Sequence, residues 1–396
     1  MPHQSTILII GGGPVGLFLA LRLAQSNISV TLLEAHSSIP ADTKAMTHMP
    51  AVFPEFEKAG VYDDLKTAAK GLTNGKIWFR RGSDKSIIGA SPAIASTTGP
   101  MTVPQQRFCE ILTDHLGSMQ NAKVLMGHKA KNINLTKSPK TVHVTAETAS
   151  GAAVEFTASW LIGADGGKSV TRRLAGLEMQ GETLPRKLVS TDVYYPFESY
   201  GWSGGNFLAD PENFGLIGPI TEDGLWRVSF GVPENYTTAD IEKVLPQKFD
   251  AMFPGPRPLE YKVERCAPFG AHQLCAEKMR KGRVLLVGDA AHLTNPYAGM
   301  GLASGILDAA SLTDVLVSHL QHGANEKVLD AWAQARRDNF RNVVDPLSKA
   351  SFWALQDPDV ESLPERHPIP KSLKSGTGVS TLPFATDVRR LSGYVA

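Results

Sequence analysis

A glycine-rich turn between two apolar segments constrains the fold of this chain more than any other feature. Residues 11–16 read GGGPVG, and they separate an apolar run at 6–10 from a longer one at 17–26. The short run is typical of a buried parallel strand, and the long one of a helix. A second short apolar run at 30–34 predicts another buried strand. The chain is therefore predicted to open with a β-α-β unit.

The turn has the spacing of a nucleotide-binding motif, G-x-G-x-x-G, with glycines at Gly11, Gly13 and Gly16. Glycines let the backbone approach a pyrophosphate, and the following helix directs free N–H groups and its positive dipole end toward it. Glu34 ends the second strand, near the separation of about 20 residues at which an acidic residue binds the ribose. The motif alone does not distinguish FAD from NAD, and a glycine turn between core strands remains the alternative.

Two later segments narrow the choice. Residues 163–169 read GADGGKS, and residues 288–292 read GDAAH, followed by Pro296 and by GMG at 299–301. An Asp-Gly pair alone is usually a turn, and a Gly-Asp pair after an apolar strand is often a helix cap. Because the occurrence of both in this order behind G-x-G-x-x-G is much rarer, the three segments together favour a dinucleotide site.

The three segments resemble the FAD fingerprint, the DG motif and the GD motif of class A flavoprotein monooxygenases, the p-hydroxybenzoate hydroxylase type. The resemblance covers about residues 5–345, and residues 192–207, 224–231 and 272–276 look most similar to fungal members, which often act in secondary metabolism. It implies one FAD, reduction by NADH or NADPH, and a flavin C4a-hydroperoxide that inserts one oxygen atom from O2. The implied reaction is hydroxylation of an aromatic or polyketide-like small molecule.

The resemblance also implies roles for individual residues. Asp289 is expected to accept hydrogen bonds from the ribityl chain, and Asp165 to lie near the pyrophosphate and the approach of the nicotinamide. Residues 299–301 are expected to start a helix whose dipole stabilises the anion of reduced flavin. Pro296 is expected to line the ring face where oxygen reacts. The complete set of predicted FAD contacts is Gly11, Gly13, Pro14, Val15, Gly16, Glu34, Lys44, Ala45, Gln105, Arg107, Asp165, Asp289, Pro296, Gly299, Met300 and Gly301.

Two positions depart from the family pattern. Lys44-Ala45 stands where many relatives have Arg-Ala near the pyrophosphate, and a lysine keeps the charge but loses bidentate geometry. Ala303 stands where many relatives have asparagine. Gln105 matches the family's glutamine beside the flavin, with Arg107 as the rival for that contact. The departures predict weaker side-chain contacts to FAD and leave the predicted fold unchanged.

The substrate side offers weaker signals. A phenolate substrate needs a group that binds or generates it, and the predicted catalytic residues are Arg227, His48 and Tyr195, in segments expected to face the flavin. Trp202 and His272 lie in similar segments. Each of these side chains has a purely structural alternative, and His272 is expected to tether a loop.

Strand patterns in the rest of the chain predict a discontinuous architecture. Strands are predicted for a hairpin at 77–80 and 86–88, for a meander at 123–126, 142–147 and 154–161, for a second sheet at 188–195, 213–217 and 226–232, and for residues 283–287. Helices are predicted at 107–116, at 301–320 and at 324–355, the last with a break at Pro346.

The predicted fold class is α/β, with a Rossmann-like FAD-binding domain, an inserted, mainly antiparallel β-sheet substrate domain, and C-terminal helices. The predicted boundaries are 1–75, 101–182 and 282–345 for the FAD-binding domain, 76–100 and 183–281 for the substrate domain, and 346–396 for a C-terminal helix and irregular tail.

Composition excludes several other classes of protein. The net charge of +1 gives no indication of a nucleic-acid partner, and three widely spaced cysteines without a CxxC pattern favour a reducing, cytoplasmic compartment without a metal site. The apolar stretch at 7–23 contains glycines and a proline and lacks a basic flank, so neither a signal peptide nor a transmembrane segment is expected. A monomer or weak homodimer is expected.

Other functions on this fold remain as alternatives. Neither the W-x-W-x-I-P motif of flavin halogenases nor the P-x-x-Y-x-W-x-F-P motif of prenyl reductases occurs in the sequence. Epoxidation or Baeyer–Villiger oxidation is the second choice after hydroxylation. A flavin-binding protein without oxygenase turnover is the alternative from another class, and the intact glycines of all three motifs argue against it.

Overall fold

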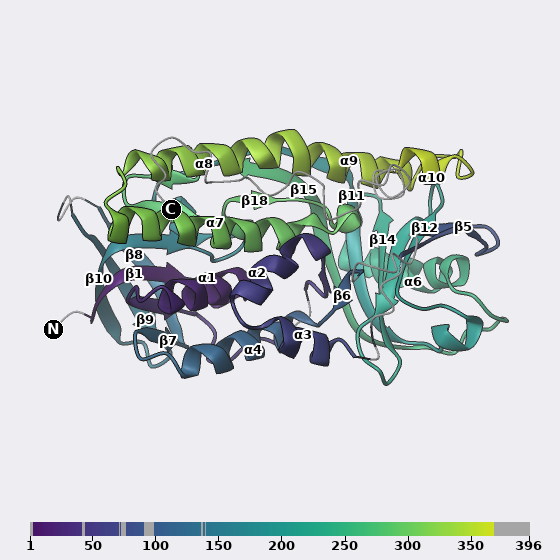
Figure 1. The fold of residues 1–396 in the computed structure, drawn as a ribbon. Helices are drawn as coiled ribbons and strands as arrows, with labels where there is room; N and C mark the ends of the chain where they lie inside the picture. The colour runs from purple at the N-terminus through teal and green to yellow at the C-terminus, as the bar shows by residue number, and fades with distance from the viewer. Residues whose placement is uncertain are drawn as a thin grey trace.

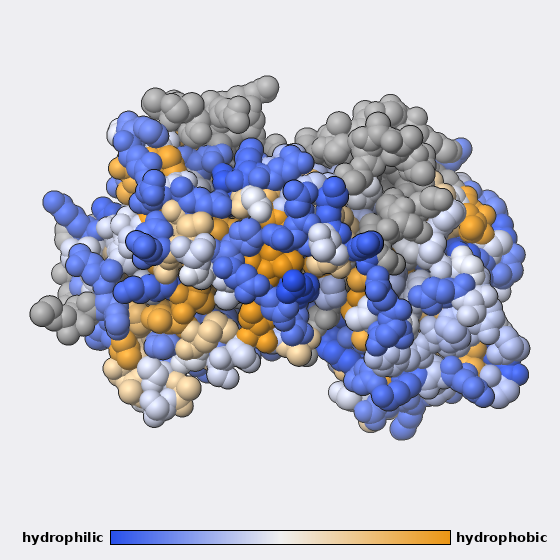
Figure 2. Space-filling view, turned by 60° about the horizontal axis from the view of Figure 1, so that its bottom comes forward, coloured by the Kyte–Doolittle hydropathy of each residue, from blue (hydrophilic) through white to orange (hydrophobic). Residues whose placement is uncertain are grey.

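Two eight-stranded sheets organise the protein into two lobes, as a computed structural model shows (Figure 1). The structure describes residues 3–41, 44–70, 72, 77–90, 99–135, 138 and 140–367. The first lobe holds the N-terminal strand and most of the long helices, and the second holds the inserted strands (Figure 1). A waist separates the lobes in the space-filling view, where hydrophilic side chains dominate the face and apolar ones form small groups (Figure 2).

The first sheet has the β-α-β core that the opening of the sequence predicts. Strand β1 (His3–Ile10) pairs in parallel with β2 (Val30–Leu33) and with β10 (Ala153–Gly163), and helix α1 (Pro14–Gln25) connects β1 to β2. All of these strands except the outer end of β10 and the start of β1 are buried, which explains their unbroken apolar runs. The sheet continues with β7 (Ala122–Leu125), β8 (His128–Asn134), β9 (Val142–Thr148), β16 (Arg280–Lys281) and β17 (Val284–Leu286).

The predicted meander at 123–161 was wrong in its first member. Strand β7 pairs in parallel with β2 at the edge of the main sheet, whereas β9 pairs antiparallel with both β8 and β10. Strand β10 belongs to both arrangements, because it also pairs in parallel with β1 and β17. A short apolar run does not reveal its pairing partner, which explains the error.

The second sheet is mainly antiparallel, as the aromatic-rich middle of the sequence predicts. Its order is β18-β15-β11-β14-β13-β12-β4-β5, and its parallel pair is β4 with β12. The strands are β4 (Ile77–Arg81), β5 (Ile87–Ala90), β11 (Met179–Tyr194), β12 (Gly205–Ala209), β13 (Gly215–Pro219), β14 (Leu225–Val232), β15 (Lys262–Ala276) and β18 (His292–Leu293).

Helix α6 (Thr238–Met252) covers one face of the second sheet, and the sequence analysis missed it. Thr237 and Asp240 form a capping box at its start, and its buried residues Ile241, Phe249 and Met252 pack onto the aromatic core of the lobe. The capping-box spacing was the available signal. The proline inside the helix, Pro246, argues against a helix in a reading of sequence alone.

The helical segment from 327 to 366 runs along one side of both lobes, and helix α7 (Met300–His322) lies beneath its first part, within the first lobe (Figure 1). Helix α7 is long and apolar enough to cross a membrane by length and composition, but most of its apolar window is buried inside the fold. It packs against α1 in the core of the first lobe, where Val15 approaches Gly305 so closely that a Cβ there would lie 2.6 Å from the valine. Its apolar composition is therefore that of a core helix.

The helical region after α7 does not break at Pro346. Helix α8 (Lys327–Asn339) passes through a π-helical turn, Phe340–Val344, into α9 (Asp345–Ala354). Pro346 lies in the first turn of α9, where a missing N–H costs little. The π-helical turn just before it shifts the hydrogen-bonding pattern of the helix, which accommodates the N–H group that Pro346 lacks. The short α10 (Leu363–Arg366) follows where an irregular tail was predicted to begin, at Pro364. The part of that tail from 368 onward lies outside the described residues.

Short elements complete the first lobe and its junction with the second. They are α2 (Phe53–Lys58), α3 (Tyr62–Ala68), α4 (Gln105–Gly117), α5 (Val170–Leu174), and the two-stranded pair β3 (Thr47–His48) and β6 (Met101–Thr102). The β3–β6 pair fixes the segment that follows Lys44 and Ala45. This segment forms part of the junction between the two lobes.

Candidate active site

The three glycine-containing motifs meet at the carboxyl ends of the parallel strands. Ala164 N donates to Ile10 O at 2.8 Å, which joins the G-x-G-x-x-G turn to the DG loop. Val287 N donates to Gly163 O at 3.0 Å, which joins the DG loop to the GD turn. Ligands of open α/β sheets bind at this edge. The structure therefore brings together segments that lie more than a hundred residues apart.

Gly11 and Gly13 of the G-x-G-x-x-G turn must each be glycine for a different physical reason. Gly11 has a φ of +111°, and a Cβ on it would lie 2.4 Å from Ala164 O, so no side chain fits there. A Cβ on Gly13 would meet nothing within 4 Å. Gly11 is therefore required by the packing of the fold itself, whereas Gly13 borders open space into which a ligand fits.

Two long helices begin at this edge without a side-chain cap. Gly13 is the N-cap of α1 and Gly299, with a φ of +65°, is the N-cap of α7, and neither start is capped by a side-chain hydrogen bond. First-turn N–H groups have no partner within their own helix, and the helix dipole adds partial positive charge there. The two starts are suited to the anionic groups of a dinucleotide and of a reduced flavin.

Glu34 lies directly beside the G-x-G-x-x-G turn. One carboxylate oxygen accepts from Gly12 N at 2.6 Å, and the other accepts from His36 N at 2.8 Å. These bonds hold the carboxylate at the end of β2, half-buried and next to the turn. The hydrogen bond from Glu34 to a ribose remains a prediction. Each carboxylate oxygen has a second lone pair that can accept such a bond.

Asp289, in the GD turn, carries the carboxylate best placed for a ligand with hydroxyl groups. Its side chain is accessible to solvent and forms no hydrogen bond or ion pair with any residue that the structure describes. Desolvation by the surrounding protein nevertheless raises the pKa of Asp289, against the opposing charges of His292 and Lys44. An accessible carboxylate without a protein partner at this edge agrees with the predicted ribityl contact.

Asp165 is committed to its own loop. Its carboxylate accepts from Ser169 Oγ at 2.5 Å and from both Thr171 N and Thr171 Oγ1, at 2.9 and 3.0 Å. These bonds fix the DG loop at the start of α5. Its predicted proximity to the pyrophosphate therefore concerns the loop backbone more than the carboxylate.

Arg172, three residues after that loop's serine, connects the DG and GD segments. Its guanidinium donates to Gly167 O and to Ala290 O, each at 2.9 Å, and the side chain is buried. An arginine donates several hydrogen bonds from one rigid plane, so it holds both loops in one geometry.

A buried charged cluster supports the GD turn from behind. Asp308 of α7 accepts from Gly288 N at 3.0 Å and from Arg336 Nε at 2.7 Å, and lies 2.7 Å from His292 Nε2. Burial acts to raise the pKa of Asp308, but the charges of His292 and Arg336 lower it below its ordinary value. The sequence analysis missed this cluster, and its signal was the acidic residue Asp308 inside the apolar first half of α7.

Gln105 and Ala45, which are both predicted FAD contacts, lie next to each other. Ala45 N donates to Gln105 Oε1 at 3.2 Å, and Gln105 N donates to Ala45 O at 3.0 Å. Arg107, the rival, is exposed and pairs with Glu110 at 3.3 Å on the surface of α4. Lys44, beside Ala45, is exposed, and its charge acts on Asp289.

The donor set fits FAD. Two uncapped helix starts, the open space at Gly13 and an accessible carboxylate at Asp289 supply the partners that pyrophosphate, flavin and ribityl groups need. Val15 packs against Gly288, so its contribution to binding comes from its backbone. Bound FAD supplies electron transfer from NAD(P)H and the activation of O2.

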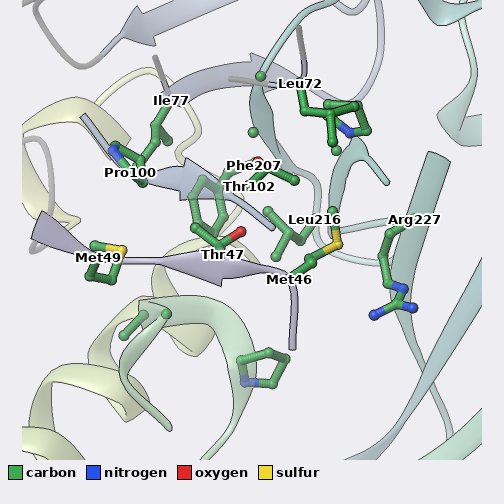
Figure 3. A pocket seen from close by; sticks show the side chains of 17 residues that line it. Met46, Thr47, Met49, Leu72, Ile77, Pro100, Thr102, Phe207, Leu216 and Arg227 are labelled. Atoms are coloured by element: carbon green, nitrogen blue, oxygen red, sulfur yellow. The ribbon is translucent and has the colours of Figure 1, made fainter. Parts of the chain in front are cut away.

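A cavity of about 90 Å³ lies where the two lobes meet (Figure 3). Pro296, Ala298 and Gly299 form its wall on the side of the FAD-binding motifs, and the β3–β6 pair forms another wall. The rest of the described lining is mostly apolar and comes from both lobes: Met46, Met49, Leu72, Ile77, Pro100, Gly204, Gly205, Phe207, Leu216, Gly218 and Pro219. Thr47 and Thr102, which are paired across β3 and β6, add two hydroxyl groups.

Arg227 is the charged side chain among the described residues of this lining. It is 5% exposed, its Nε donates to Asp192 Oδ1 at 2.7 Å, and its Nη1 donates to Lys44 O at 2.8 Å. The guanidinium therefore joins a strand of the second sheet to the segment that is predicted to contact FAD. Of the predicted catalytic residues, Arg227 is the one that the structure places at the cavity.

His48 lies outside the cavity. Its chain neighbours Thr47 and Met49 line the cavity, and the alternation of an extended segment turns His48 to the opposite side. There its ring packs edge-on against Phe56 and Phe108, with centroid distances of 5.7 and 4.7 Å. Burial lowers the pKa of His48 to about 4, so the ring is neutral near pH 7. This placement corrects the expectation that His48 faces the flavin.

Tyr195 also lies outside the cavity. Its hydroxyl donates to Pro254 O, and its ring packs against Phe197 and Phe253 in the core of the second lobe. Burial, with Tyr200 close by, raises the pKa of Tyr195 to about 12. The expectation that Tyr195 faces the flavin is corrected in the same way, because the side chain is part of an aromatic cluster behind the sheet.

The two lesser candidates have structural roles. Trp202 stacks under the guanidinium of Arg80, whose central carbon lies 4.3 Å from the ring centroid. His272 lies on β15, and its Nδ1 is 2.9 Å from Thr183 Oγ1 on the paired strand β11. The expectation that His272 tethers a loop is wrong, because the residue lies inside a strand and its side chain joins two paired strands.

Comparisons with known proteins agree with this site. The FAD binding domain family matches residues 4–346. Para-nitrophenol 4-monooxygenase of Pseudomonas sp. (strain WBC-3) is 32% identical over 359 residues, which cover 89% of this chain and 88% of that protein. The 6-hydroxy-3-succinoylpyridine 3-monooxygenase HspB of Pseudomonas putida (strain DSM 28022 / S16) is 33% identical over 363 residues, with 90% of each chain covered. The crystal structure of p-nitrophenol 4-monooxygenase PnpA from Pseudomonas putida DLL-E4 has a TM-score of 0.87 and 30% identity, and covers 95% of this chain and 97% of that one.

Fold, site and comparisons together define a class A FAD-dependent monooxygenase that hydroxylates an aromatic small molecule with NAD(P)H and O2. The chain belongs to the FAD binding domain family. The relatives named above are bacterial, and the likeness to fungal members remains an expectation from the sequence.

Proposed function

We propose that this enzyme hydroxylates a small phenol or hydroxypyridine that contains a single aromatic ring. The observation that carries the proposal is the cavity, which is small, mostly apolar and has one cation in its described wall. Such a lining suits a flat ring with one anionic substituent. The names of two relatives, para-nitrophenol 4-monooxygenase and 6-hydroxy-3-succinoylpyridine 3-monooxygenase, each indicate one hydroxylated aromatic ring.

In this proposal, the FAD-binding residues are those predicted from the sequence, with main-chain groups contributing at Val15 and Asp165. Arg227 holds the ionised hydroxyl of the substrate, which makes the ring electron-rich and reactive toward oxygen insertion. Pro296 and Gly299 lie on the side of the FAD-binding motifs, so a ring in the cavity faces the flavin. The apolar lining excludes water from the reacting atoms.

The domain division is part of the proposal. The FAD-binding domain comprises the predicted segments 1–75, 101–182 and 282–345, and the substrate domain comprises 76–100 and 183–281. Apart from β16 at 280–281, which falls just before the boundary at 282, the strands of the first sheet lie in the former set, which supports the division. Strand β11 begins at Met179, so the boundary near 182 lies inside one strand. Strand β18 at 292–293 also joins the second sheet from the FAD-binding segment.

The test is turnover of the FAD-loaded protein with NADPH or NADH across phenols, hydroxypyridines and larger polycycles, with masses of the products. We expect a single-ring phenol to accelerate oxidation of the nicotinamide and to gain one oxygen atom. Preference for polycycles, a ring-expanded ester or an epoxide would contradict the proposal and favour the alternative reactions. Reduction that no compound stimulates would indicate a flavin-binding protein without turnover.

We further infer a cytoplasmic location and a monomeric or weakly dimeric state. All three cysteines, Cys109, Cys266 and Cys275, are free thiols in the structure, which agrees with a reducing compartment. Sedimentation of the purified enzyme at micromolar concentration tests the oligomeric state, and a stable higher oligomer would contradict it.

A further inference from the structure

A row of charged side chains crosses the second sheet and ends beside the cavity. Asp192 on β11 is the register partner of both Arg265 on β15 and Arg227 on β14. Directly paired residues of antiparallel strands share one face of the sheet. Asp192 lies 2.7 Å from Arg227 and 3.8 Å from Arg265, and its side chain is only 8% exposed. The carboxylate therefore fixes the direction of Arg227 without lining the cavity itself.

The same row continues into a floor of glycines, Gly218 on β13 and Gly205 on β12. Gly218 is the register partner of Arg227, and Gly205 is that of Ile77, which also lines the cavity. Figure 3 shows the neighbouring side chains Arg227, Leu216 and Met46 around this part of the cavity. Along the row, the charged pair Asp192 and Arg227 is followed by the bare backbone of the two glycines and then by the apolar side chain of Ile77.

The space above the two glycines is open. A Cβ on Gly205 would meet nothing within 4 Å, and a Cβ on Gly218 would come no closer than 3.7 Å to Gly204 O. Neither glycine has a φ in the left-handed region, so neither backbone conformation requires glycine. The absence of side chains keeps room next to the guanidinium, and bare backbone of two adjacent strands offers a flat surface.

We propose that the substrate's ring lies flat on Gly205 and Gly218 while its anionic oxygen pairs with Arg227, which Asp192 holds in position. This inference rests on the proposed function and specifies the subsite that selects the substrate. Asp192 is a positioning residue, and the two glycines determine specificity for flat rings. A guanidinium close to an oxyanion favours its ionised form and lowers the pKa of a bound phenol by about 1–3.

The shape of the subsite is tested with Gly205→Ala and Gly218→Ala in the FAD-loaded enzyme. The probe is para-nitrophenol, whose binding is followed by difference absorbance without NAD(P)H. Each methyl group occupies the place of the ring, so we expect the Kd to rise about tenfold, as for an overpacked contact. The matched control is Gly117→Ala at the exposed end of α4, where a Cβ also meets nothing within 4 Å. Equal Kd values in all three variants and the unmodified enzyme would overturn the placement of the ring.

The charge of the subsite is tested through the ionisation of the same probe. The ionised form of para-nitrophenol is yellow, so a pH titration of the bound probe reports its pKa independently of turnover. We expect this pKa to lie at least about one unit below that of the free phenol. Arg227→Lys keeps the charge and should retain the shift with weaker binding, whereas Arg227→Met should abolish the shift. An unshifted pKa in the unmodified enzyme would overturn the pairing with Arg227.

Asp192→Asn separates positioning from simple support of the fold. Removal of the carboxylate takes away a negative charge beside the subsite, so the pKa of the bound phenol should fall further. The orientation of Arg227 is then less fixed, so kcat should fall while FAD content is retained. A loss of stability with an unchanged pKa of the bound phenol would show a purely structural role and overturn the assignment of Asp192.

Two comparisons complete the test. An anionic oxygen can also come from a carboxylate, and benzoate as a competitor distinguishes the sources: weaker competition by benzoate assigns the subsite to a phenolate, and stronger competition to a carboxylate. The binding measurements do not depend on oxygenation. Phenols that bind in the expected pattern without being oxygenated would refute the proposed function alone, and oxygenation without this pattern would refute the subsite alone.

Discussion

The FAD-binding edge and the substrate cavity are built in opposite ways. At the edge, the binding groups are mainly main-chain atoms: uncapped helix starts at Gly13 and Gly299 and loops shaped by glycine. In the cavity, side chains from both lobes supply the walls, and one cation, Arg227, is held by Asp192 and by a backbone carbonyl. A site made of main-chain groups can be formed by short sequence motifs. A site made of side chains forms only when segments distant in the sequence pair in the right register.

This difference predicts that damage at the edge removes the cofactor, whereas damage in the cavity changes which substrate binds. The cavity variants Gly205→Ala and Gly218→Ala test the second half of this prediction, two changes at the edge test the first, and two changes outside both sites serve as comparison, from the largest expected effect to the smallest.

Gly13→Val should give folded protein with little FAD. The structure leaves open space at this position, so the chain accommodates the side chain while the ligand does not. We expect the FAD content after purification to fall below roughly a tenth of that of the unmodified protein, which requires a loss of at least about 1.4 kcal/mol in binding. The control is Gly11→Ala, which should fail to fold because its Cβ would lie 2.4 Å from Ala164 O. A yellow, fully loaded Gly13→Val protein would show that the pyrophosphate does not approach this turn.

Asp289→Ala should weaken FAD binding through the loss of one carboxylate. Hydrogen bonds to a charged group contribute about 1.5–3 kcal/mol, so we expect the Kd for FAD to rise roughly tenfold to a hundredfold. Flavin fluorescence titration of the apoprotein measures this. Unchanged affinity would remove Asp289 from the FAD site, and a matched loss in Asp223→Ala, a surface aspartate of the second lobe, would indicate a non-specific effect.

The free energy of unfolding should depend on pH through His48. Its pKa is about 4 in the folded protein and 6.5 in the unfolded chain, so the contribution of His48 to stability is at its maximum above pH 6.5, where neither state binds the proton. Stability is lost as the pH falls from 6.5 toward 4, by roughly 3 kcal/mol in all. Urea unfolding at several pH values measures this slope.

His48→Phe should make that slope shallower by the share of His48, because a phenyl ring between Phe56 and Phe108 does not titrate, whereas His367, whose pKa burial lowers to about 3, keeps its own share. The variant should retain turnover, since His48 lies on the far side of β3 from the cavity. Abolished turnover with intact FAD binding would place His48 in the catalytic machinery and contradict the structure.

Arg107→Ala should have the smallest effect. Arg107 is exposed and pairs with Glu110 on the surface, and such pairs contribute about 0–1 kcal/mol. We expect unchanged FAD content and a change in unfolding free energy within about 0.5 kcal/mol. A loss of FAD would make Arg107, rather than Gln105, the contact beside the flavin.

The sequence by itself determined the β-α-β opening, the class of fold and the place of the three motifs. Each depends on local physical requirements: a glycine where a side chain clashes, a free helix start, and an apolar run long enough for a buried strand. These requirements act over a few residues, so they can be recognised without knowing what lies next to them in space. The same reasoning gave the antiparallel character of the second sheet.

The tertiary structure alone decided the composition of the cavity and the partners of each strand. His48 and Tyr195 have side chains that could act in catalysis, but the fold packs each of them among aromatic side chains away from the cavity. Strand β7 joined β2 in parallel, and Asp192 became the partner of Arg227, because pairing register across a sheet depends on segments far away in the sequence. Register decides which face each side chain occupies, and so it separates a wall of the cavity from the core behind it.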